Sequence, residues 1–315
     1  MKEAELIRLF TRGAPLHGEG VVLGVGDDAA VLRPPPGEEL VVTVDAVVEG
    51  VHFDERAAPG DVGWKALAVN LSDLAAMGAR PLWAFCALAF PRATGARALA
   101  AVGRGFAACA RAHRIVLAGG NVSGARELSL TVTVAGAVAR GRALRRDGAR
   151  PGDVLCVSGT LGDAALGLLP GAPPAATRRQ RRPIPRIALG RELAGIVTAG
   201  LDVSDGLLVD LGRMCEASGV GAEVALAALP RSAAYRRWAR GADDPWRLAA
   251  AGGEDYELLV AVPEARLGRA LAAARRARTP LAPIGRVVRG RAVVARLPDG
   301  ERYRPAATGW DHLAP

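Results

Sequence analysis

Strand-like and helical segments alternate through the first 139 residues, and this alternation limits the possible folds more than any other feature of the chain. The β-branched run in residues 37–53 predicts a strand that ends near Asp45. The helical pattern in residues 60–81 stops at Gly78 and Pro81, residue types that end helices. Further strands are expected at 83–90, 114–121 and 127–139, and a further helix at 95–113. Strands with intervening helices indicate a mixed α/β domain.

A polar, charged stretch that contains Gly and Pro, residues 140–153, separates this pattern from a second one. Domain boundaries fall in stretches of this composition, so we expect one domain at 1–139 and another at 140–315. A length of 315 residues also favours two domains. In the second domain we expect strands at 153–160 and 256–262, helices after Leu161 and at 186–200, 207–219 and 263–277, a proline-rich loop after the first helix, and a turn at 202–206.

The formal net charge of +9 raises the question of nucleic-acid binding. The charge is uneven, because residues 1–130 hold 13 basic and 14 acidic residues, a net of −1, and the remainder carries +10. The densest basic run, Arg178–Arg182, contains no aromatic residue on which bases would stack. Since 39 of the 41 basic residues are arginine, we interpret the charge as compositional bias and expect no nucleic-acid partner.

Neither a membrane span nor an export signal is predicted. No apolar run approaches the roughly 18 residues that a transmembrane helix requires. Residues 1–13 carry acidic residues where a signal peptide needs an apolar core, so we interpret them as an amphipathic helix. The four cysteines lie far apart without a CxxC pair, which favours reduced, buried thiols. We therefore expect a cytoplasmic protein with no membrane partner.

Acidic residues stand beside glycines or at the ends of apolar elements. They are Asp27 and Asp28 after Gly24 and Gly26, Asp45, Asp73 beside Asn70 and Ser72, Asp202 and Asp205 around Ser204, and Glu254 with Asp255 after Gly252 and Gly253. A single Asp of this kind is usually a cap or a turn residue. Six or more, each within an apolar element where burying a bare carboxylate is costly, indicate a bound cation. Oxygen ligands alone suit Mg²⁺ held together with substrate phosphates.

The glycine turn expected at Ala118–Asn121 closes a strand with amides that are able to approach phosphate oxygens. The ordinary nucleotide motifs are absent, since no GxxxxGK[ST] sequence occurs and Lys65 is the only lysine beyond residue 2. Gly24 and Gly26 begin a GxG, but a third glycine is missing, and the two acids that follow would repel a bare pyrophosphate. ATP bound together with Mg²⁺ is the nucleotide chemistry that the sequence leaves open.

Seven segments resemble the thiamine-monophosphate kinase family, in order and over nearly the whole chain. They read GVGDDAAVL, TVDAVVEGVHF, WKALAVNLSDLAAMGARP, AGGNVS, DVSDGLLVDL, GGEDYELL and TGWDHL. The family shares a superfamily with aminoimidazole ribonucleotide synthetase, but VEGVHF, GGEDYELL and GWDHL together favour the kinase branch. The resemblance implies an α/β domain at 1–139 that binds ATP and Mg²⁺ and forms a homodimer through its mixed sheet. It also implies an α+β domain at 140–315 that completes the ATP and substrate site.

The same resemblance implies roles for individual residues. The matching magnesium ligands are Asp27, Thr43, Asp45, Asp73, Asp202 and Asp205, with Asp28 as a weaker candidate. The positions that touch ATP are Gly120, Asn121, Arg146 and Ser204. The positions that hold thiamine monophosphate are His52, Glu254 and Trp310. On residue type alone, His52 would be a partly buried histidine and Trp310 a surface aromatic, so the motif context carries both assignments.

Asn121 departs from the family pattern. The family's glycine turn reads GGD, with the Asp as a magnesium ligand, whereas this chain has GGN. Asn keeps a carbonyl oxygen but loses the charge, so we expect Asn121 to be a weakened metal ligand and the Mg²⁺ requirement to rise. The other interpretation is that the protein has drifted away from kinase activity.

The implied reaction is Mg²⁺-assisted, in-line phosphoryl transfer from ATP to thiamine monophosphate, which gives thiamine diphosphate. A phosphate monoester is already largely ionised at neutral pH, so no catalytic base is needed and none is assigned. Two alternatives stay open at this stage. One is an ATP-dependent ligase or cyclase of the same superfamily that phosphorylates an amide or carboxylate oxygen, and the other is a basic binding protein without enzymatic activity.

Overall fold

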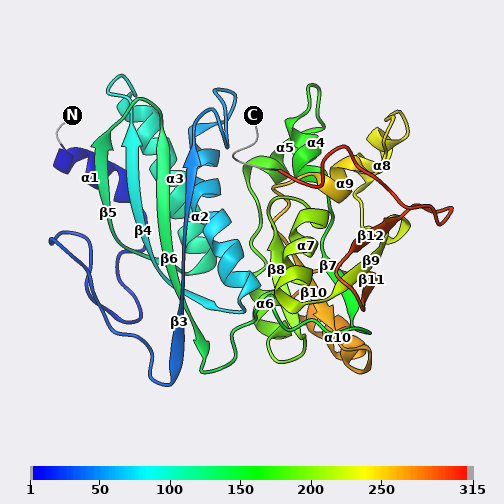
Figure 1. The fold of residues 1–315 in the computed structure, drawn as a ribbon. Coiled ribbons are helices and arrows are strands. Elements are labelled where there is room, and N and C mark those ends of the chain that lie inside the picture. The colour runs from blue at the N-terminus through cyan, green and yellow to red at the C-terminus, as the bar shows by residue number, and fades with distance from the viewer. Residues whose placement is uncertain (1–2, 311–315) are drawn as a thin grey trace. The chain divides into compact units, whose positions relative to one another are not determined.

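The computed structural model describes residues 3–310, which divide into two compact units. Unit 1 comprises the residues up to Leu74 together with Ala79–Gly141. Unit 2 comprises Ala75–Gly78 together with the residues from Arg142 onwards. Each unit is built around its own sheet, with a separate two-stranded ribbon in unit 1 (Figure 1). The last residues of the GWDHL motif, Asp311 to Leu313, lie outside the described residues.

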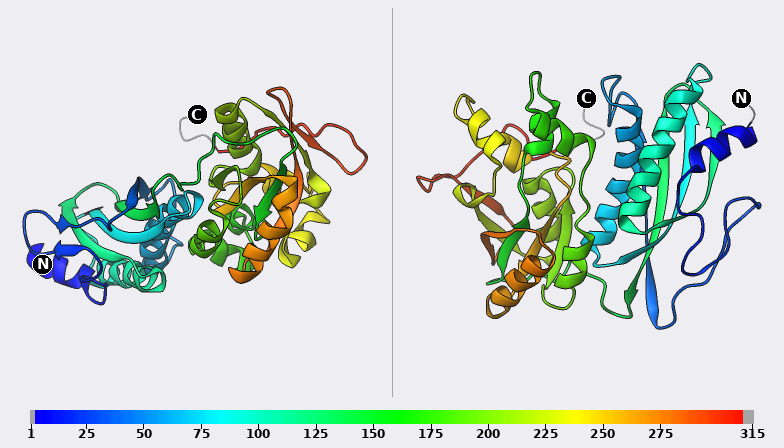
Figure 2. Two further views of the ribbon diagram at one scale, coloured as in Figure 1. Left: turned by 90° about the horizontal axis from the view of Figure 1, so that it is seen from below. Right: turned by 180° about the vertical axis from the view of Figure 1, so that it is seen from behind.

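Unit 1 holds a four-stranded mixed sheet in the order β3-β6-β4-β5, with helices on one face (Figure 2). Its elements are α1 (Glu3–Thr11), β1 (Val21–Leu23), β2 (Val31–Leu32), β3 (Glu38–Val48), α2 (Pro59–Ala76), β4 (Arg80–Phe90), α3 (Ala96–His113), β5 (Val116–Gly124) and β6 (Ser129–Ala139). β4 pairs with β5 in parallel, whereas β6 is antiparallel to both β3 and β4. The ribbon of β1 and β2 packs against the other face, where Val21 and Leu32 contact a core that contains Trp83.

The side chains of β3 alternate between two environments, because successive residues of a strand point to opposite faces of the sheet. Thr43 points toward α2, since its hydroxyl contacts Asp73 of that helix. Leu40, Val42 and Val44 alternate with it and are exposed on the opposite face, Val42 to 60% and Val44 to 58%. One strand therefore carries polar ligand candidates on its helix side and an uncovered apolar row on the other.

Unit 2 holds a six-stranded sheet in the order β12-β9-β11-β7-β10-β8, in which the β12–β9 pair is parallel. Its elements are β7 (Val154–Ser158), α4 (Asp163–Leu168), α5 (Pro174–Arg181), α6 (Ile187–Leu193), β8 (Ala199–Val203), α7 (Leu207–Ser218), β9 (Gly221–Ala225), α8 (Ala233–Ala239), α9 (Arg247–Ala251), β10 (Glu257–Val262), α10 (Leu267–Arg276), β11 (Leu281–Val288), β12 (Val293–Arg296) and the 3-10 turns Leu226–Ala228 and Glu264–Arg266. Both faces of this sheet are covered, because Leu155 and Val157 of β7 enter one core while Val154 and Cys156 enter another.

The expected fold class is confirmed, with an α/β unit followed by an α+β unit, but three local expectations are wrong. The expected glycine turn at Ala118–Asn121 is part of β5, which continues to Gly124. A Cβ at Gly120 would lie 2.1 Å from the carbonyl oxygen of Cys86, so glycine is needed there because β5 runs close to β4, not because the chain turns.

The other two errors concern unit 2. The helix expected at 186–200 ends at Leu193, and β8 occupies its final residues. The expected proline-rich loop contains α5, in which Pro174 stands at the start of the helix, where its missing N–H has no cost. No pattern in the sequence indicated β9, β11, β12, α8 or α9. All four cysteines are buried and free, as expected, and none of the helices within residues 3–310 has the length and apolar character of a membrane span.

Candidate active site

In unit 1, Thr43 of β3 meets Asp73 of α2. Thr43 Oγ1 donates a hydrogen bond of 2.7 Å to Asp73 Oδ2, and Asp45 follows on the same side of the strand. One helical turn before Asp73, Asn70 is fully buried, and its Oδ1 has no hydrogen-bond partner among the described residues. Residues three apart on a helix are neighbours, so this stretch of α2 places an unpartnered carbonyl oxygen near a carboxylate. Such a group of oxygens suits a hard cation.

Asp27 and Asp28 are exposed, and the expectation that an apolar element buries them is wrong. The N–H of Asp28 donates to Asp27 Oδ1 over 2.8 Å, a contact within a surface turn. Gly26 precedes the pair with a φ of +123°, which residues with a Cβ rarely adopt. Exposed carboxylates are accessible to a hydrated ion. An ion bound by Asp27 and Asp28 would therefore not depend on a buried environment.

Gly120 and Asn121 are exposed on β5, where they pair with Cys86 and Ala87 of β4. β5 is an edge strand of its sheet, so its second side is not paired with another strand. Gly120 is exposed and has no side chain of its own, so its backbone is accessible to a ligand. The position fits a phosphate contact even though the turn that was expected to make this contact is absent.

His52 is held in place through its ring and its backbone. Its Nδ1 accepts the N–H of Val48 at 3.2 Å, and its carbonyl oxygen accepts from Lys65 Nζ at 2.9 Å. A ring nitrogen that accepts carries no proton, so in the neutral imidazole the proton lies on Nε2. His52 therefore presents a donor at Nε2, and Lys65, which is only 2% exposed, fixes the turn that carries it.

In unit 2, Asp210 of α7 organises residues 202–206, in which the last two residues of β8 lead into a loop. Asp210 Oδ2 accepts the backbone N–H groups of Ser204, Asp205 and Gly206 at 3.1, 3.0 and 3.1 Å. Burial raises the pKa of Asp210, and these hydrogen bonds oppose the increase. Arg213 Nη1 lies 2.6 Å from Asp210 Oδ1 and 2.7 Å from Asp205 Oδ2.

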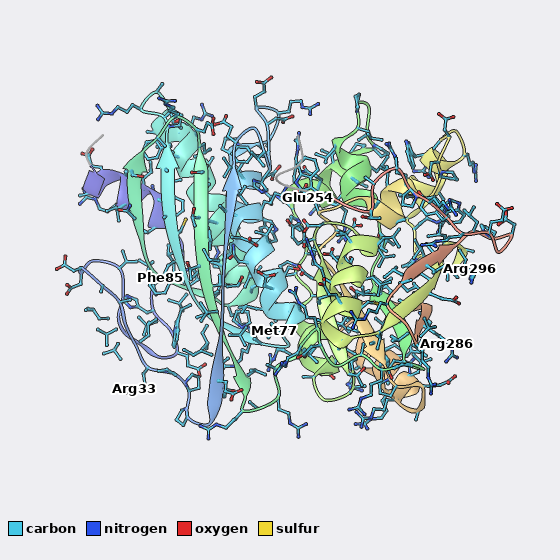
Figure 3. All side chains as sticks on the ribbon, in the orientation of Figure 1. Arg33, Met77, Phe85, Glu254, Arg286 and Arg296 are labelled. Atoms are coloured by element: carbon cyan, nitrogen blue, oxygen red, sulfur yellow. The ribbon has the colours of Figure 1, made fainter. Side chains whose placement is uncertain are left out.

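Two further contacts join this loop to Glu254 and Trp310. The N–H of Glu254 donates to the carbonyl oxygen of Ser204 at 2.7 Å, and the N–H of Trp310 donates to that of Asp205 at 2.9 Å. The side chain of Glu254, labelled in Figure 3, accepts from Gln180 Nε2 of α5 at 2.9 Å. Within unit 2, three predicted site segments that are far apart in sequence thus lie side by side.

A buried charged network lies next to Glu254 in sequence. Glu257 is fully buried, and Arg179, Arg186 and Ser158 all bond to its carboxylate, at 2.6 Å from Arg179 Nη2. Asp255 accepts the N–H of Gly162 at 2.6 Å, and burial raises its pKa to about 8. The basic run Arg178–Arg182 is therefore partly internal, because Arg179 is engaged with this network and is not displayed for nucleic acid.

Arg146 is exposed near the start of unit 2. Its carbonyl oxygen accepts from Ser218 Oγ at 3.0 Å, which ties the segment to the end of α7. Its neighbours Arg145 and Asp147 form an ion pair at 2.5 Å. The exposed guanidinium of Arg146 is a candidate contact for an anionic ligand.

The predicted metal ligands form no closed cage in either unit. Within residues 3–310, no three His, Cys, Asp or Glu side chains are grouped closely enough to hold an ion. Mg²⁺ is usually bound by one or two carboxylates together with water and substrate phosphates, so a protein site without a third carboxylate fits this ion. The Thr43–Asp73 pair, the unpartnered Asn70 Oδ1 and the paired Asp205 are all oxygen donors of the required kind.

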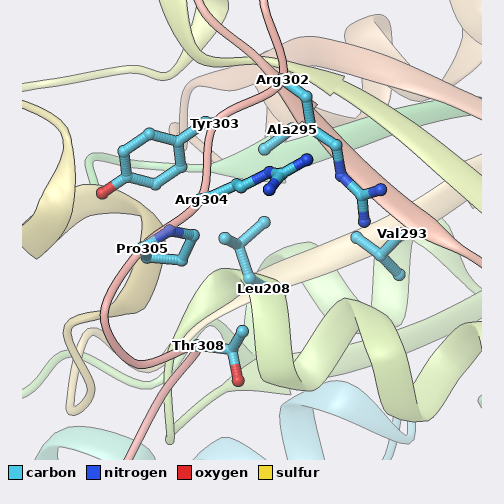
Figure 4. Close-up of a pocket in the computed structure, with 8 residues that line it drawn as sticks. All are labelled: Leu208, Val293, Ala295, Arg302, Tyr303, Arg304, Pro305 and Thr308. Atoms are coloured by element: carbon cyan, nitrogen blue, oxygen red, sulfur yellow. The ribbon is translucent and has the colours of Figure 1, made fainter.

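Unit 2 also contains a cavity of about 290 Å³ between α7, β12 and the segment 302–308 (Figure 4). Leu208, Val293 and Ala295 form its apolar part, and Arg302 and Arg304 flank it. None of the predicted site residues lines it. The cavity approaches the site loop through Leu208, which lies in the first turn of α7, and through Thr308, two residues before Trp310.

Four residues that organise the site were not identified from the sequence: Lys65, Gln180, Asp210 and Arg213. Lys65 carried a signal, since it is the only lysine in an arginine-rich chain beyond residue 2. Asp210 lies four residues after Gly206, the spacing of a carboxylate that folds back on the first turn of its own helix. Gln180 and Arg213 lie within arginine-rich or amphipathic helices, where the sequence does not distinguish an inward side chain from an outward one.

Comparison with protein families identifies two matching models. The model described as AIR synthase related protein, N-terminal domain, matches residues 26–138. The model described as AIR synthase related protein, C-terminal domain, matches residues 150–297. Together they cover most of the chain.

Individual relatives are similar over nearly their full length. Thiamine-monophosphate kinase of Escherichia coli K12 is 39% identical over 304 residues, which is 93% of each chain. The crystal structure of thiamine-monophosphate kinase from Stenotrophomonas maltophilia has a TM-score of 0.84 and 43% identity, and the match covers 95% of this chain and 96% of that one. A structure of AaThiL complexed with AMPPCP and TMP has a TM-score of 0.79 and 30% identity, with coverage of 98% and 96%.

Proposed function

The chain belongs to the thiamine-monophosphate kinase family, and from this premise we propose how its own residues perform the family's reaction. It phosphorylates thiamine monophosphate with ATP and forms thiamine diphosphate and ADP. The observation that carries this function is the 39% identity to a thiamine-monophosphate kinase over 93% of both chains.

The test is direct detection of the product. The full chain is incubated with ATP, Mg²⁺ and thiamine monophosphate, and thiamine diphosphate is measured by mass spectrometry. Formylglycinamidine ribonucleotide replaces thiamine monophosphate in a parallel reaction that measures ADP release. Thiamine diphosphate in the first reaction and no ADP in the second is the expected result. ADP release with the ribonucleotide, and no thiamine diphosphate in the first reaction, would show that the protein is a ligase or cyclase and not a kinase.

The main obstacle to this reaction is electrostatic repulsion between two phosphate groups. The attacking oxygen of thiamine monophosphate belongs to a phosphate that is already largely ionised at neutral pH, so no residue has to remove a proton. Two anions must nevertheless approach each other closely. The chain's contribution is therefore to bind and align both phosphate groups, which is the main catalytic term in phosphoryl transfer.

We propose that Mg²⁺ is held by oxygen ligands. The ligands are Asp27, Thr43, Asp45, Asp73, Asp202 and Asp205, with Asp28 and Asn121 as weaker ones. The Thr43–Asp73 hydrogen bond and the unpartnered Asn70 Oδ1 support this assignment in unit 1. When bound, Mg²⁺ screens the charge of the two phosphate groups and stabilises the charge on the leaving ADP.

For ATP, we propose contacts from Gly120, Asn121, Arg146 and Ser204. Gly120 has no side chain to obstruct a phosphate, and Asn121 follows it on the exposed part of the same strand. Ser204 is presented by a loop whose backbone N–H is fixed to Asp210. Arg146 supplies a cation for the anionic nucleotide.

For thiamine monophosphate, we propose His52, Glu254 and Trp310. The Nε2–H of His52 is a donor suited to a phosphate oxygen, since Nδ1 is occupied by Val48. The thiazolium ring of the substrate is cationic. A carboxylate at Glu254 and the face of Trp310, which is 56% exposed, attract a flat cation by charge and by cation–π interaction.

The assembly and location of the protein are proposed on separate grounds. Leu40, Val42 and Val44 form an uncovered apolar row on β3, and a twofold-related copy of the sheet would bury it, so we propose a homodimer. Residues 1–139 would then bind ATP and Mg²⁺ and dimerise, while 140–315 complete the ATP and substrate site. Four buried, free thiols fit a reducing compartment, so we propose a cytoplasmic location.

A further inference from the structure

Arg213 of α7 contacts two carboxylates at the same time. Its Nη1 lies 2.7 Å from Asp205 Oδ2 and 2.6 Å from Asp210 Oδ1. The two carboxylates differ in what else they do. Asp210 is buried and holds the backbone of the loop 204–206 through its other oxygen, so it cannot leave without unmaking the loop. The contact between Asp205 and Arg213 does not hold the loop backbone in this way, and Asp205 is a proposed metal ligand.

A metal ion and Arg213 would compete for the same oxygen. Both are cations, and a carboxylate oxygen paired with a guanidinium at 2.7 Å is not open to an ion on that side. The side chain of Asp205 is 17% exposed, so its pairing is less screened by water and salt than a surface ion pair. The side chain of Arg213 is 42% exposed and keeps Asp210 as a partner, so releasing Asp205 leaves neither Arg213 nor Asp210 unpaired.

We propose that Arg213 is a built-in counter-cation for the loop 204–206. It neutralises Asp205 when no metal is bound, and it moves off this carboxylate, while staying paired with Asp210, when Mg²⁺ enters together with the nucleotide. This inference rests on the proposed metal role of Asp205. Its consequence is that Arg213 weakens metal binding, because part of the binding energy is used to displace it.

The test measures metal binding without turnover. Mn²⁺ is titrated into the full-length protein in the presence of AMPPCP, and free Mn²⁺ is measured by electron paramagnetic resonance. Arg213→Gln removes the competitor, and about fivefold tighter Mn²⁺ binding is expected, the factor that corresponds to a partly exposed ion pair. Arg302→Gln is the matched control, because it removes one positive charge next to α7 without touching Asp205, and its Mn²⁺ affinity should stay within twofold of wild type.

A second variant protects the test against a folding defect. Arg213→Gln leaves the buried Asp210 carboxylate without its cation, which is destabilising. The double variant Asp210→Asn with Arg213→Gln preserves the net charge of the protein and a side-chain oxygen for the three N–H groups. It should bind Mn²⁺ as tightly as Arg213→Gln does. Thermal unfolding by circular dichroism shows whether each of the two variants is folded.

The outcomes separate this inference from the proposed function. Asp205→Asn should weaken Mn²⁺ binding. If it does, and Arg213→Gln and the double variant bind no tighter than wild type, the counter-cation role is overturned while Asp205 remains a ligand. The counter-cation role is also overturned if Arg302→Gln tightens binding as much as Arg213→Gln, since general charge then explains the effect. If Asp205→Asn binds Mn²⁺ like wild type, Asp205 is not a ligand. The proposed metal role of Asp205 and the counter-cation role of Arg213 are then both overturned.

Discussion

Lys65 Nζ donates a hydrogen bond of 2.9 Å to the carbonyl oxygen of His52, and this contact joins a proposed substrate residue to α2. The same helix carries Asp73, which Thr43 contacts from β3. In unit 1, one helix therefore supports His52, a proposed hydrogen-bond donor to the substrate phosphate, and Asp73, a proposed metal ligand. Lys65 is buried, in a chain that otherwise uses arginine for nearly all of its basic residues.

Replacing Lys65 should raise the KM for thiamine monophosphate more than the KM for ATP. Lys65→Met keeps the length of the side chain but removes the donor to His52, so the turn loses a charged hydrogen bond worth about 1.5–3 kcal/mol. We expect the KM for thiamine monophosphate to rise about tenfold or more, with the KM for ATP within twofold of wild type. Steady-state kinetics with each substrate varied in turn measures both values.

A double-mutant cycle then checks the route of the effect. His52→Ala and Lys65→Met should together cost much less than the sum of their separate effects, because Lys65 acts through His52. Additive effects, or an equal rise in both KM values, would show that Lys65 supports the unit as a whole and does not position His52.

Asp73→Asn should abolish most of the activity and leave the fold intact. Asn retains an oxygen that accepts from Thr43, but the charge that attracts Mg²⁺ is lost. The expected cost is several kcal/mol of transition-state stabilisation, a loss of roughly 100-fold or more in kcat/KM. Asp61→Asn, on the same helix but outside the proposed set, is the control and should remain close to wild type. An Asp73→Asn enzyme within tenfold of wild type would contradict the metal assignment.

The helices and strands were predictable where the hydrophobic pattern ends at the same place as a glycine or proline that stops an element. The segments that form β3, β4, β6 and α3 are long and clearly periodic, and their positions agree with the expectation. β9 and β12 are short strands, and β11 is interrupted by Pro283 and Gly285, where its register shifts. The pairing partners of these strands lie far along the chain, for example Val224 with Gly285. A single sequence contains no information about such pairing. The expectation of a turn at Ala118–Asn121 is wrong because a close approach between strands requires glycine just as a turn does.

The site was predictable by residue type but not by its connections. Asp202, Ser204 and Asp205 are expected from the motif, whereas the carboxylate of Asp210 that holds their loop resembles any polar residue on an amphipathic helix. In the same way, Arg179 and Gln180 belong to a run whose composition is typical of a solvated surface, yet they face Glu257 and Glu254. Whether a charged side chain points inward is decided by tertiary packing.

The apolar row on β3 predicts how the protein assembles. Val42→Asp places a charge in the centre of a surface that a partner sheet would bury, so it should convert a dimer into a monomer. Light scattering at micromolar concentration should give a dimer for wild type and a monomer for the variant. Leu168→Asp, which changes an exposed apolar residue of unit 2, is the control and should stay dimeric. A monomeric wild type would rule out the proposed dimer.

Asp255 should make stability depend on pH. Its pKa is raised by burial to about 8, well above the ordinary value of 3.8, so the folded state keeps a proton that the unfolded state loses. The stabilisation is fully present below about pH 4 and is lost as the pH rises toward about 8. Asp255→Asn keeps an acceptor for Gly162 and does not titrate, so its free energy of unfolding should fall less over this range. Urea unfolding between about pH 5 and pH 8 measures the difference, and parallel curves for the two proteins would contradict the raised pKa.

Asn121→Asp should lower the Mg²⁺ concentration at which the enzyme reaches half of its maximal rate. The substitution restores a charged oxygen on the exposed part of β5, and Mg²⁺ prefers carboxylates to amide oxygens. Ser123→Asp, which adds the same charge two residues further along the same strand, is the matched control and should leave the Mg²⁺ titration unchanged. If Asn121→Asp titrates like wild type, Asn121 does not contact the metal. If wild type is inactive at every Mg²⁺ concentration and Asn121→Asp restores turnover, the loss of this carboxylate is the step by which the protein drifted from kinase activity.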